Sequence, residues 1–353
     1  RAPVEAEDLQ QLTDRLLAPP AIRAEFGFAA RVLVPPGHLY DPLFMVPQDA
    51  GAWLNDDGGE EKDKGSRLLS IDRQGNISVL AGMGKLLPVT GFDVAPPGFG
   101  EYGGQIFALA QGKVPMAGAP ASHVVQRVDP QQSYAASVFC TLPELGGGKD
   151  RGFGAEARFG PQGSPFAGKF YVVVTDHHTI YQVTPDEVCI PFVTFDAERV
   201  GDPFGLTFAA DGNSMLVTVA RDDLLNSSAK KMGMIVRVLP NGRVEDRPVA
   251  RGLTSPSGLA LAPATFGIYA GQIFVADVVS MQTPVSVTPA LAADGKVYRV
   301  TRQGELYTVA SGFVNPTSLC FVGNSLWVSD SNGDFSAGKR ALLDGFVVTI
   351  TDR

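Results

Sequence analysis

The chain repeats a pattern of alternating apolar and polar residues six times. Each copy begins with a short alternating segment, which a tight turn and a second apolar segment follow in the first five copies. The first copy is SRLLSIDRQGNISVL and the sixth is DGFVVTITDR. The last apolar residues before the turns lie 50 to 62 residues apart, at Ile71, Val128, Val183, Val238, Val300 and Ile350. A period of this length predicts a repeat fold whose unit holds four strands.

Turn chemistry and burial pattern distinguish the strands within one unit. The turns Arg-Gln-Gly-Asn, Pro-Asn-Gly-Arg and Arg-Gln-Gly-Glu are typical of tight hairpins, and the alternation around them predicts two half-buried strands. Two further apolar runs precede each hairpin, as in PSGLALAP followed by GQIFVAD. Because strands buried on both faces show continuous apolar runs, these segments predict the two inner strands of the unit.

Six such units predict an all-β fold, a six-bladed β-propeller, which leaves only short sheet edges. The sixth unit ends one outer strand short, whereas residues 26–37, FGFAARVLVPPG, form an apolar segment ahead of the first unit. We therefore expect this N-terminal strand to close the ring. Residues 5–24 predict a short helix, giving an N-terminal extension over 1–25 and a single propeller domain over 26–353. Two unrelated β-sandwiches are the alternative, and repetition along the whole chain argues against them.

Composition excludes several classes of partner. The chain has 353 residues, of which 44% are hydrophobic and 19% charged, and its formal net charge is -8. Nucleic acids and anionic membranes attract basic surfaces, so neither is expected as a partner. No apolar run reaches the ~20 residues of a membrane-spanning helix. The sequence begins at Arg1, which predicts that a leader segment was removed; we expect a periplasmic or secreted protein, with the cytoplasm as the alternative.

The three cysteines, Cys140, Cys189 and Cys320, lie far apart in the sequence. They show none of the Cys or His spacings of a zinc site. We interpret them as small buried hydrophobic residues on strands.

Acidic residues gather where the second strands of the units end. In a propeller, residues before the first strand and after the second strand share a face, and loops on a rigid scaffold commonly carry function. Carboxylate oxygens from several elements are the ligands that Ca²⁺ prefers, so these positions predict a calcium site. The alternative is that each aspartate caps the turn that follows its strand. The candidate ligands come from units that become consecutive when the ring closes: Asp41, Asp56, Asp277 and Asp330.

Candidate catalytic residues lie across the ring from these aspartates. His177 and His178 are candidates for a general base, because imidazole titrates near neutral pH, and Arg221 lies on the next unit. Neighbouring residues at a strand end point to opposite sides, so at most one of the two histidines faces the centre. Substrate contacts are expected from residues near the same strand ends: Asn55, Glu156, Phe204, Ser257, Asn315 and Thr317.

Two long Pro-containing apolar loops, 113–122 and 278–294, follow second strands on the same face. They are expected either to roof a pocket for a small, partly apolar molecule or to form a subunit contact. The oligomeric state stays open.

The phrases SPSGLALAP, DPFGLTFAADG and GKVYRVTRQGE resemble a superfamily of six-bladed propellers. It holds gluconolactonases and senescence-marker-type lactonases, calcium phosphotriesterases, paraoxonases and strictosidine synthase, with NHL-repeat proteins nearby. The resemblance implies a metal held by a Glu, two Asn and an Asp at the starts of inner strands. Asp41 matches as a carboxylate, Ser257 stands where an Asn is expected, and Glu156 falls one residue after the family Glu.

Three functions follow as expectations. The first is a hydrolase of a small lactone, ester or related molecule at the mouth of the central tunnel, with calcium as a cofactor. The second is a metal-free lyase or condensing enzyme, as resemblance to strictosidine synthase implies. The third is a non-catalytic propeller that binds a ligand or a protein. Fold alone does not choose among them.

Overall fold

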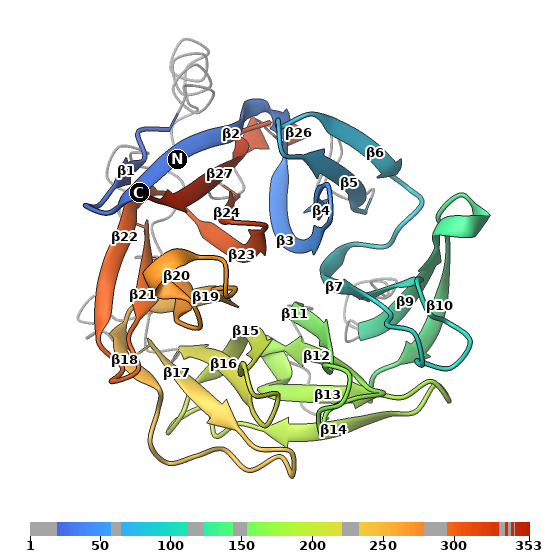
Figure 1. Ribbon diagram of the computed structural model, residues 1–353. Coiled ribbons are helices and arrows are strands. Elements are labelled where there is room, and N and C mark those ends of the chain that lie inside the picture. The colour runs from blue at the N-terminus through green and yellow to red at the C-terminus, as the bar shows by residue number, and fades with distance from the viewer. Residues whose placement is uncertain are drawn as a thin grey trace, which may run out of the picture.

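The computed structural model is a ring of six antiparallel sheets around one axis (Figure 1). It describes residues 20–57, 65–111, 123–143, 154–220, 233–278, 295–331, 336–337, 340–341 and 343–353. Each sheet of the ring is a blade whose first strand lies nearest the axis. The repeat read from the sequence is therefore confirmed as a six-bladed β-propeller.

The blades are numbered along the chain and their strands from the axis to the rim. Blades 1 and 2 consist of β3 (Asp41–Gln48), β4 (Gly51–Asp57), β5 (Arg67–Asp72) and β6 (Ile77–Ala81), then β7 (Val89–Val94), β8 (Ile106–Gln111), β9 (His123–Asp129) and β10 (Ala135–Thr141). Blades 3 and 4 consist of β11 (Gly154–Phe159), β12 (Phe170–Val174), β13 (Thr179–Val183) and β14 (Cys189–Thr194), then β15 (Asp202–Phe208), β16 (Met215–Ala220), β17 (Gly233–Val238) and β18 (Ala250–Leu253). Blades 5 and 6 consist of β19 (Ser255–Leu261), β20 (Ile273–Val278), β21 (Gly295–Val300) and β22 (Leu306–Phe313), then β23 (Pro316–Val322), β24 (Ser325–Asp330), β27 (Gly345–Asp352) and β2 (Phe28–Leu39). A two-stranded hairpin, β25 (Ser336–Ala337) and β26 (Arg340–Ala341), lies outside the blades.

The N-terminal strand closes the ring, as the sequence predicts. β2 pairs antiparallel with β27 at the rim of blade 6, with Phe28 opposite Asp352. The strand occupies 28–39 rather than the predicted 26–37. β1 (Arg23–Ala24) adds to the rim of blade 5. The helix predicted over 5–24 is not confirmed, because residues 5–19 lie outside the described residues and residues 23–24 form a strand.

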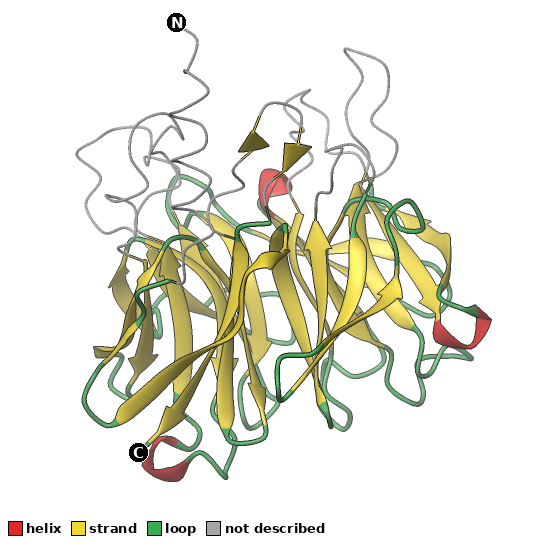
Figure 2. Ribbon diagram, turned by 90° about the horizontal axis from the view of Figure 1, so that it is seen from above, coloured by secondary structure: helices red, strands yellow, loops and turns green. Residues whose placement is uncertain are grey.

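The helices in the described part of the chain are short 3-10 turns: η1 (Pro130–Gln132), η2 (Thr175–His177) and η4 (Gly267–Tyr269). None of them has the length and hydrophobicity needed to cross a membrane. Figure 2 shows the strands running between two faces of the ring. We call the face that carries the C terminus the lower face and the opposite one the upper face. First strands run from the upper face to the lower face.

Burial explains why the inner strands are continuously apolar. Every residue of β12 and of β20 is buried, since each of these strands lies between two neighbouring blades. The rim strand β6 instead exposes Ser78 and Val79 and buries only Ala81. Aromatic rings fill the wedges between blades, as where Phe266 of blade 5 meets Phe321 of blade 6 edge-on at 4.9 Å between ring centroids. The apolar runs thus form the interfaces between blades.

Every first strand carries a bulge near its upper end. The register between first and second strand shifts by one residue at the same place in all six blades. A bulge bends its strand and leaves backbone groups without a partner in the ladder. In blade 4, Thr218 opposite the bulge accepts a hydrogen bond from the Gly205 N–H at 2.6 Å and donates to the Ser257 carbonyl of blade 5 at 2.7 Å. The Thr218 hydroxyl therefore bonds both to the bulge of its own blade and to the backbone of the next blade.

A hydrogen bond between a side chain and the backbone links each pair of neighbouring blades, and we call this set the polar belt. Side chains supply one partner and backbone the other, with donor–acceptor distances of 2.5 to 2.9 Å. Going round the ring, the bonds are Asn55 to the Val89 carbonyl, the Phe159 N–H to Asp93, Thr175 to the Pro203 carbonyl, Thr218 to the Ser257 carbonyl, Ser257 to the Pro316 carbonyl, and Ser329 to the Leu43 carbonyl. The polar belt fixes the blades to one another where they come closest to the axis.

The polar belt can be tested at Thr218. Thr218→Val keeps the shape of the side chain but leaves the buried Gly205 N–H and the Ser257 carbonyl without this partner, at a cost of about 1–3 kcal/mol. We expect a lower melting temperature and a lower urea midpoint. Thr141→Val, at an exposed position of β10, is the control and should change stability by less than about 0.5 kcal/mol. Equal effects of the two variants would contradict a special role for the belt.

Candidate functional site

Three of the predicted calcium ligands cap the entry of the first strand in their own blade. Asp56, Asp277 and Asp330 are the last or next-to-last residues of second strands, and each lies directly opposite a proline: Pro42, Pro256 or Pro316. Proline has no N–H to offer the ladder. The carboxylates instead accept the backbone N–H groups that come just before these prolines, at 2.8 to 3.2 Å, from Tyr40 and Asp41, Thr254 and Ser255, and Val314 and Asn315.

The fourth predicted ligand, Asp41, stands at the start of β3 and donates its N–H to Asp56. Asp56 also accepts two bonds from Arg67, at 2.6 and 2.7 Å, and burial raises its pKa to about 6 although Arg67 opposes the change. In the described part of the chain, no three His, Cys, Asp or Glu residues are arranged to hold a metal ion. The four aspartates, as placed, do not fit a shared Ca²⁺.

The capping role predicts the behaviour of an Asp277 variant. Asp277→Ala removes the acceptor of two N–H groups at a buried strand end, so we expect a loss of about 1–3 kcal/mol of stability. The fall in melting temperature should be the same with added Ca²⁺ and with a chelator. Asp246→Ala is the control, because the Asp246 side chain is 91% exposed. A deficit that is present with Ca²⁺ and disappears with a chelator would instead show that Asp277 is a metal ligand.

The two predicted histidines have different surroundings. His177 is buried, its Nδ1 lies 2.8 Å from the Tyr181 hydroxyl, and its ring meets His123 edge-on at 5.1 Å between centroids. His123 belongs to blade 2 and Tyr181 to blade 3, so His177 lies between these blades. His178 is half exposed at the upper face, and its Nδ1 contacts the Asp202 carboxylate at the start of β15. The histidine–carboxylate pair expected of a general base is thus formed by His178 with Asp202.

Most of the predicted substrate contacts have identifiable roles in the scaffold. Asn55 and Ser257 belong to the polar belt. Phe204 packs against Phe44 at 5.9 Å between ring centroids. Asn315 donates to the Ser331 hydroxyl at 2.6 Å, and the buried Thr317 donates to the Asn315 carbonyl at 3.1 Å. The predicted catalytic Arg221 and the loops 113–122 and 279–294 lie outside the described residues.

A cavity of about 750 Å³ lies on the propeller axis at the lower face. All six first strands contribute to it, together with loops that lead into the second strands, and its size is typical of small-molecule sites. Each blade contributes one equivalent residue to the wall of the cavity, four residues after the start of the bulge in its first strand. These residues are Val46, Asp93, Arg158, Thr207, Ala260 and Cys320. The upper face was the expected location, so this central cavity is a site that sequence reasoning missed.

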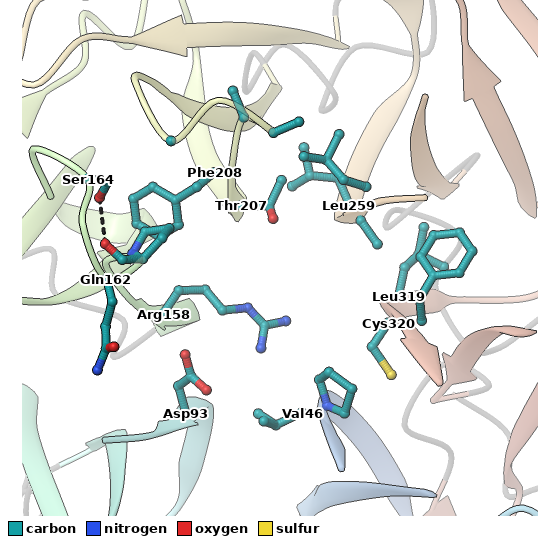
Figure 3. A pocket seen from close by; sticks show the side chains of 18 of the residues that line it. Val46, Asp93, Arg158, Gln162, Ser164, Thr207, Phe208, Leu259, Leu319 and Cys320 are labelled. Atoms are coloured by element: carbon teal, nitrogen blue, oxygen red, sulfur yellow. Dashed lines mark hydrogen bonds between the residues drawn. The ribbon is translucent and has the colours of Figure 1, made fainter. Parts of the chain in front are cut away.

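Arg158 extends its guanidinium into the middle of the cavity, and the Asp93 carboxylate faces it (Figure 3). Behind the guanidinium, Arg158 Nη2 lies 2.7 Å from Oε1 of the buried Glu156 and donates to the Met45 carbonyl at 3.3 Å. Asp93 accepts the N–H groups of Val94 and Phe159 at 2.8 and 2.9 Å. We call Asp93, Glu156 and Arg158 the axial charge cluster.

Burial sets the protonation of this cluster. Burial raises the pKa of Glu156 to about 7 although Arg158 opposes the change, and it raises the pKa of Asp93 in the same way. Both carboxylates share one guanidinium, so Arg158 cannot fully compensate two negative charges. Burial also raises the pKa of Cys320 to about 12, which keeps its thiol protonated at neutral pH. Carboxyl groups with raised pKa values beside a fixed cation in a cavity are typical of functional sites.

The sequence does carry a signal for these residues. Asp93 stands in GFDVAP and Arg158 in EARFGP, each one residue before the end of an innermost strand. A charged residue buried at such a position requires a partner or a function. Of the residues predicted for the site, Glu156 is the one that belongs to the cluster.

The raised pKa of Glu156 predicts how stability depends on pH. The folded protein holds this proton up to about pH 7, whereas an ordinary Glu loses it near 4.5, so the free energy of unfolding falls as pH rises between these values. The full effect is on the order of 3 kcal/mol. We expect the melting temperature to fall between about pH 4.5 and pH 7, and Glu156→Gln to make that fall shallower. Glu305→Gln, at an exposed turn, should leave the slope unchanged, and an unchanged slope in Glu156→Gln would contradict the assignment.

Comparison with known proteins identifies the fold but does not identify the activity. No family model and no curated protein matches the sequence. Similar solved structures include a gluconolactonase from Xanthomonas campestris, with a TM-score of 0.57, 13% identity and 95% of each chain covered. A streptogramin B lyase has a TM-score of 0.52 and 12% identity, covering 94% of this chain and 100% of its own.

A third similar structure is the PQQ-bound aldose sugar dehydrogenase from Streptomyces coelicolor, with a TM-score of 0.55, 15% identity and coverage of 95% of this chain and 100% of its own. The three neighbours have different activities on the same six-bladed ring. At these identities the similarity shows the fold alone, so the chemistry has to be argued from the residues of the site.

Proposed function

We propose that this protein is a hydrolase of a small, partly apolar lactone or ester, and that the substrate binds in the central cavity against Arg158. The observation that carries the proposal is the axial charge cluster at the centre of a cavity of about 750 Å³. Resemblance to gluconolactonase-type propellers supports the substrate class, and the geometry supports the binding mode.

Arg158 is suited to bind the carbonyl oxygen of such a substrate. Its contacts with Glu156 and Met45 both use Nη2, so among the contacts described for this side chain Nη1 and Nε remain as further donors. Negative charge develops on the carbonyl oxygen when water attacks a lactone or an ester. A buried guanidinium aimed at that oxygen stabilises the charge more strongly than water does, because the surrounding dielectric is low.

Asp93 is the candidate general base, because it lines the cavity and faces the guanidinium (Figure 3). Its raised pKa makes it a better proton acceptor than an ordinary aspartate, provided that it is ionised when substrate binds. The proton of the attacking water passes to Asp93 and then to the alcohol oxygen that leaves. Glu156 touches neither water nor substrate in this scheme, and its role is to hold the Arg158 guanidinium in position.

The protonated state of the Cys320 thiol argues against covalent catalysis by this residue. Cys320 lines the cavity, but the thiolate is the nucleophilic form and burial raises the pKa of this thiol to about 12. Direct attack by water is therefore the mechanism that the lining residues support.

One observation favours a second candidate, a base-catalysed elimination at the upper face. The contact of His178 Nδ1 with Asp202 fixes the imidazole and leaves Nε2 as the atom that would accept a proton. A lyase at this face would use His178 and would not require Arg158. The two candidates therefore predict opposite responses to two substitutions.

The decisive experiment is a panel of γ- and δ-lactones and short-chain aryl esters, followed by pH-stat or by chromophore release. We expect Arg158→Gln to lower kcat/KM by roughly 100-fold or more, as the loss of an oxyanion donor does. Asp93→Asn should remove the rise of activity with pH that follows ionisation of the base. His178→Ala should leave hydrolysis within about twofold of the unchanged protein, since it lies outside the proposed mechanism.

Arg302→Gln, at an exposed turn, is the matched control for loss of an arginine, and melting curves show whether each variant is folded. Hydrolysis that survives Arg158→Gln but is lost in His178→Ala would move the reaction to the upper face. A folded protein that hydrolyses no member of the panel would contradict the proposed hydrolase function.

A further inference from the structure

Two cysteines from neighbouring blades meet at the rim of the propeller. Cys140 of β10 in blade 2 and Cys189 of β14 in blade 3 have their Sγ atoms 3.0 Å apart, although 49 residues separate them in the sequence. The two strands belong to different sheets, so no backbone ladder joins them. The distance is about 1 Å longer than a disulfide bond of ~2.05 Å, so a small side-chain movement would allow the bond to form.

We infer that Cys140 and Cys189 form a disulfide that links blades 2 and 3 in an oxidising environment. Cys140 is buried and Cys189 is half-buried, so a reagent can reach one partner while the other is protected. The third cysteine, Cys320, lines the central cavity instead. It is therefore expected to remain a free thiol. This inference does not depend on the proposed hydrolase function.

The oxidant is a low-molecular-weight disulfide such as oxidised glutathione. The Cys189 thiolate attacks one of its sulfurs, which forms a mixed disulfide and releases one glutathione thiol. Cys140, after losing its proton, then attacks the Cys189 sulfur, which forms the protein disulfide and releases the second thiol. Two protein thiols lose two protons and two electrons, and one glutathione disulfide gains them.

The position of the pair gives the bond a mechanical consequence. Blades 2 and 3 are joined at the axis by the Phe159 N–H to Asp93 bond, and the pair would add a covalent link at the rim. The hydrogen bond to Cys140 and burial raise the pKa of Cys189, so unassisted exchange at neutral pH is slow. Disulfides persist in the periplasm and outside the cell, which are the compartments expected for this protein.

The test uses the full chain, fully reduced and then incubated with oxidised glutathione at mildly alkaline pH. After alkylation in denaturant, we expect an intact mass about 2 Da below that of the reduced, unalkylated chain once the label on Cys320 is subtracted. Peptide mapping should identify a cross-link between Cys140 and Cys189 and an alkylated Cys320. The oxidised protein should melt roughly 5 °C higher than the reduced protein, because the link restricts the unfolded chain.

Cys140→Ser and Cys189→Ser provide matched controls, since each keeps one cysteine of the pair and should lose the oxidation-dependent rise in melting temperature. A stable glutathione adduct on Cys189 with Cys140 still open to alkylation would overturn the inference. So would a bond that involves Cys320. The comparison of oxidised with reduced protein needs no variant, so a variant that fails to fold leaves the test intact.

Discussion

The bulge near the upper end of each first strand is the constraint on which the rest of this propeller depends. It turns backbone groups away from the ladder at the point where six strands converge, and these groups need partners because water is excluded there. Thr218 and Ser329 each satisfy their own bulge and the next blade with one hydroxyl. Polar side chains at the upper ends of the inner strands are therefore largely engaged in holding blades together.

The same constraint explains which charged side chains hold the backbone and which ones face the cavity. Asp56, Asp277 and Asp330 lie opposite prolines and accept the N–H groups that enter the first strand, so their oxygens are engaged in structure. Beyond the bulge the ladder is regular again, and of the side chains directed to the axis Asp93 still joins blades 2 and 3 by accepting the Phe159 N–H. Arg158 and Asp93 occupy that level, where they face a cavity rather than a turn.

The fold was predictable because its signals are repeated and local. Six alternating segments, three of them followed by turns that contain Gly, six pairs of apolar runs and one orphan strand at 26–37 leave little freedom in how the sheets are assembled. The site was less predictable, because an aspartate at a strand end looks the same whether it binds Ca²⁺ or caps a strand. The facing proline, which becomes visible once register is known, is what indicates the capping role. Likewise, Cys140 and Cys189 are brought together by blade packing, which no sequence spacing encodes.

Six equivalent positions line the central cavity, and their differences indicate how a ligand would be oriented. Blades 2 and 3 contribute Asp93 and Arg158, whereas blades 5, 6 and 1 contribute Ala260, Cys320 and Val46. The scaffold is the same at each position, so the asymmetry comes from side chains alone. A bound molecule would gain most by turning its polar carbonyl towards blades 2 and 3 and its apolar part towards the opposite wall. A partly apolar ester or lactone satisfies both halves of the cavity, whereas a uniformly polar sugar would leave its hydroxyl groups against the apolar wall without hydrogen-bond partners.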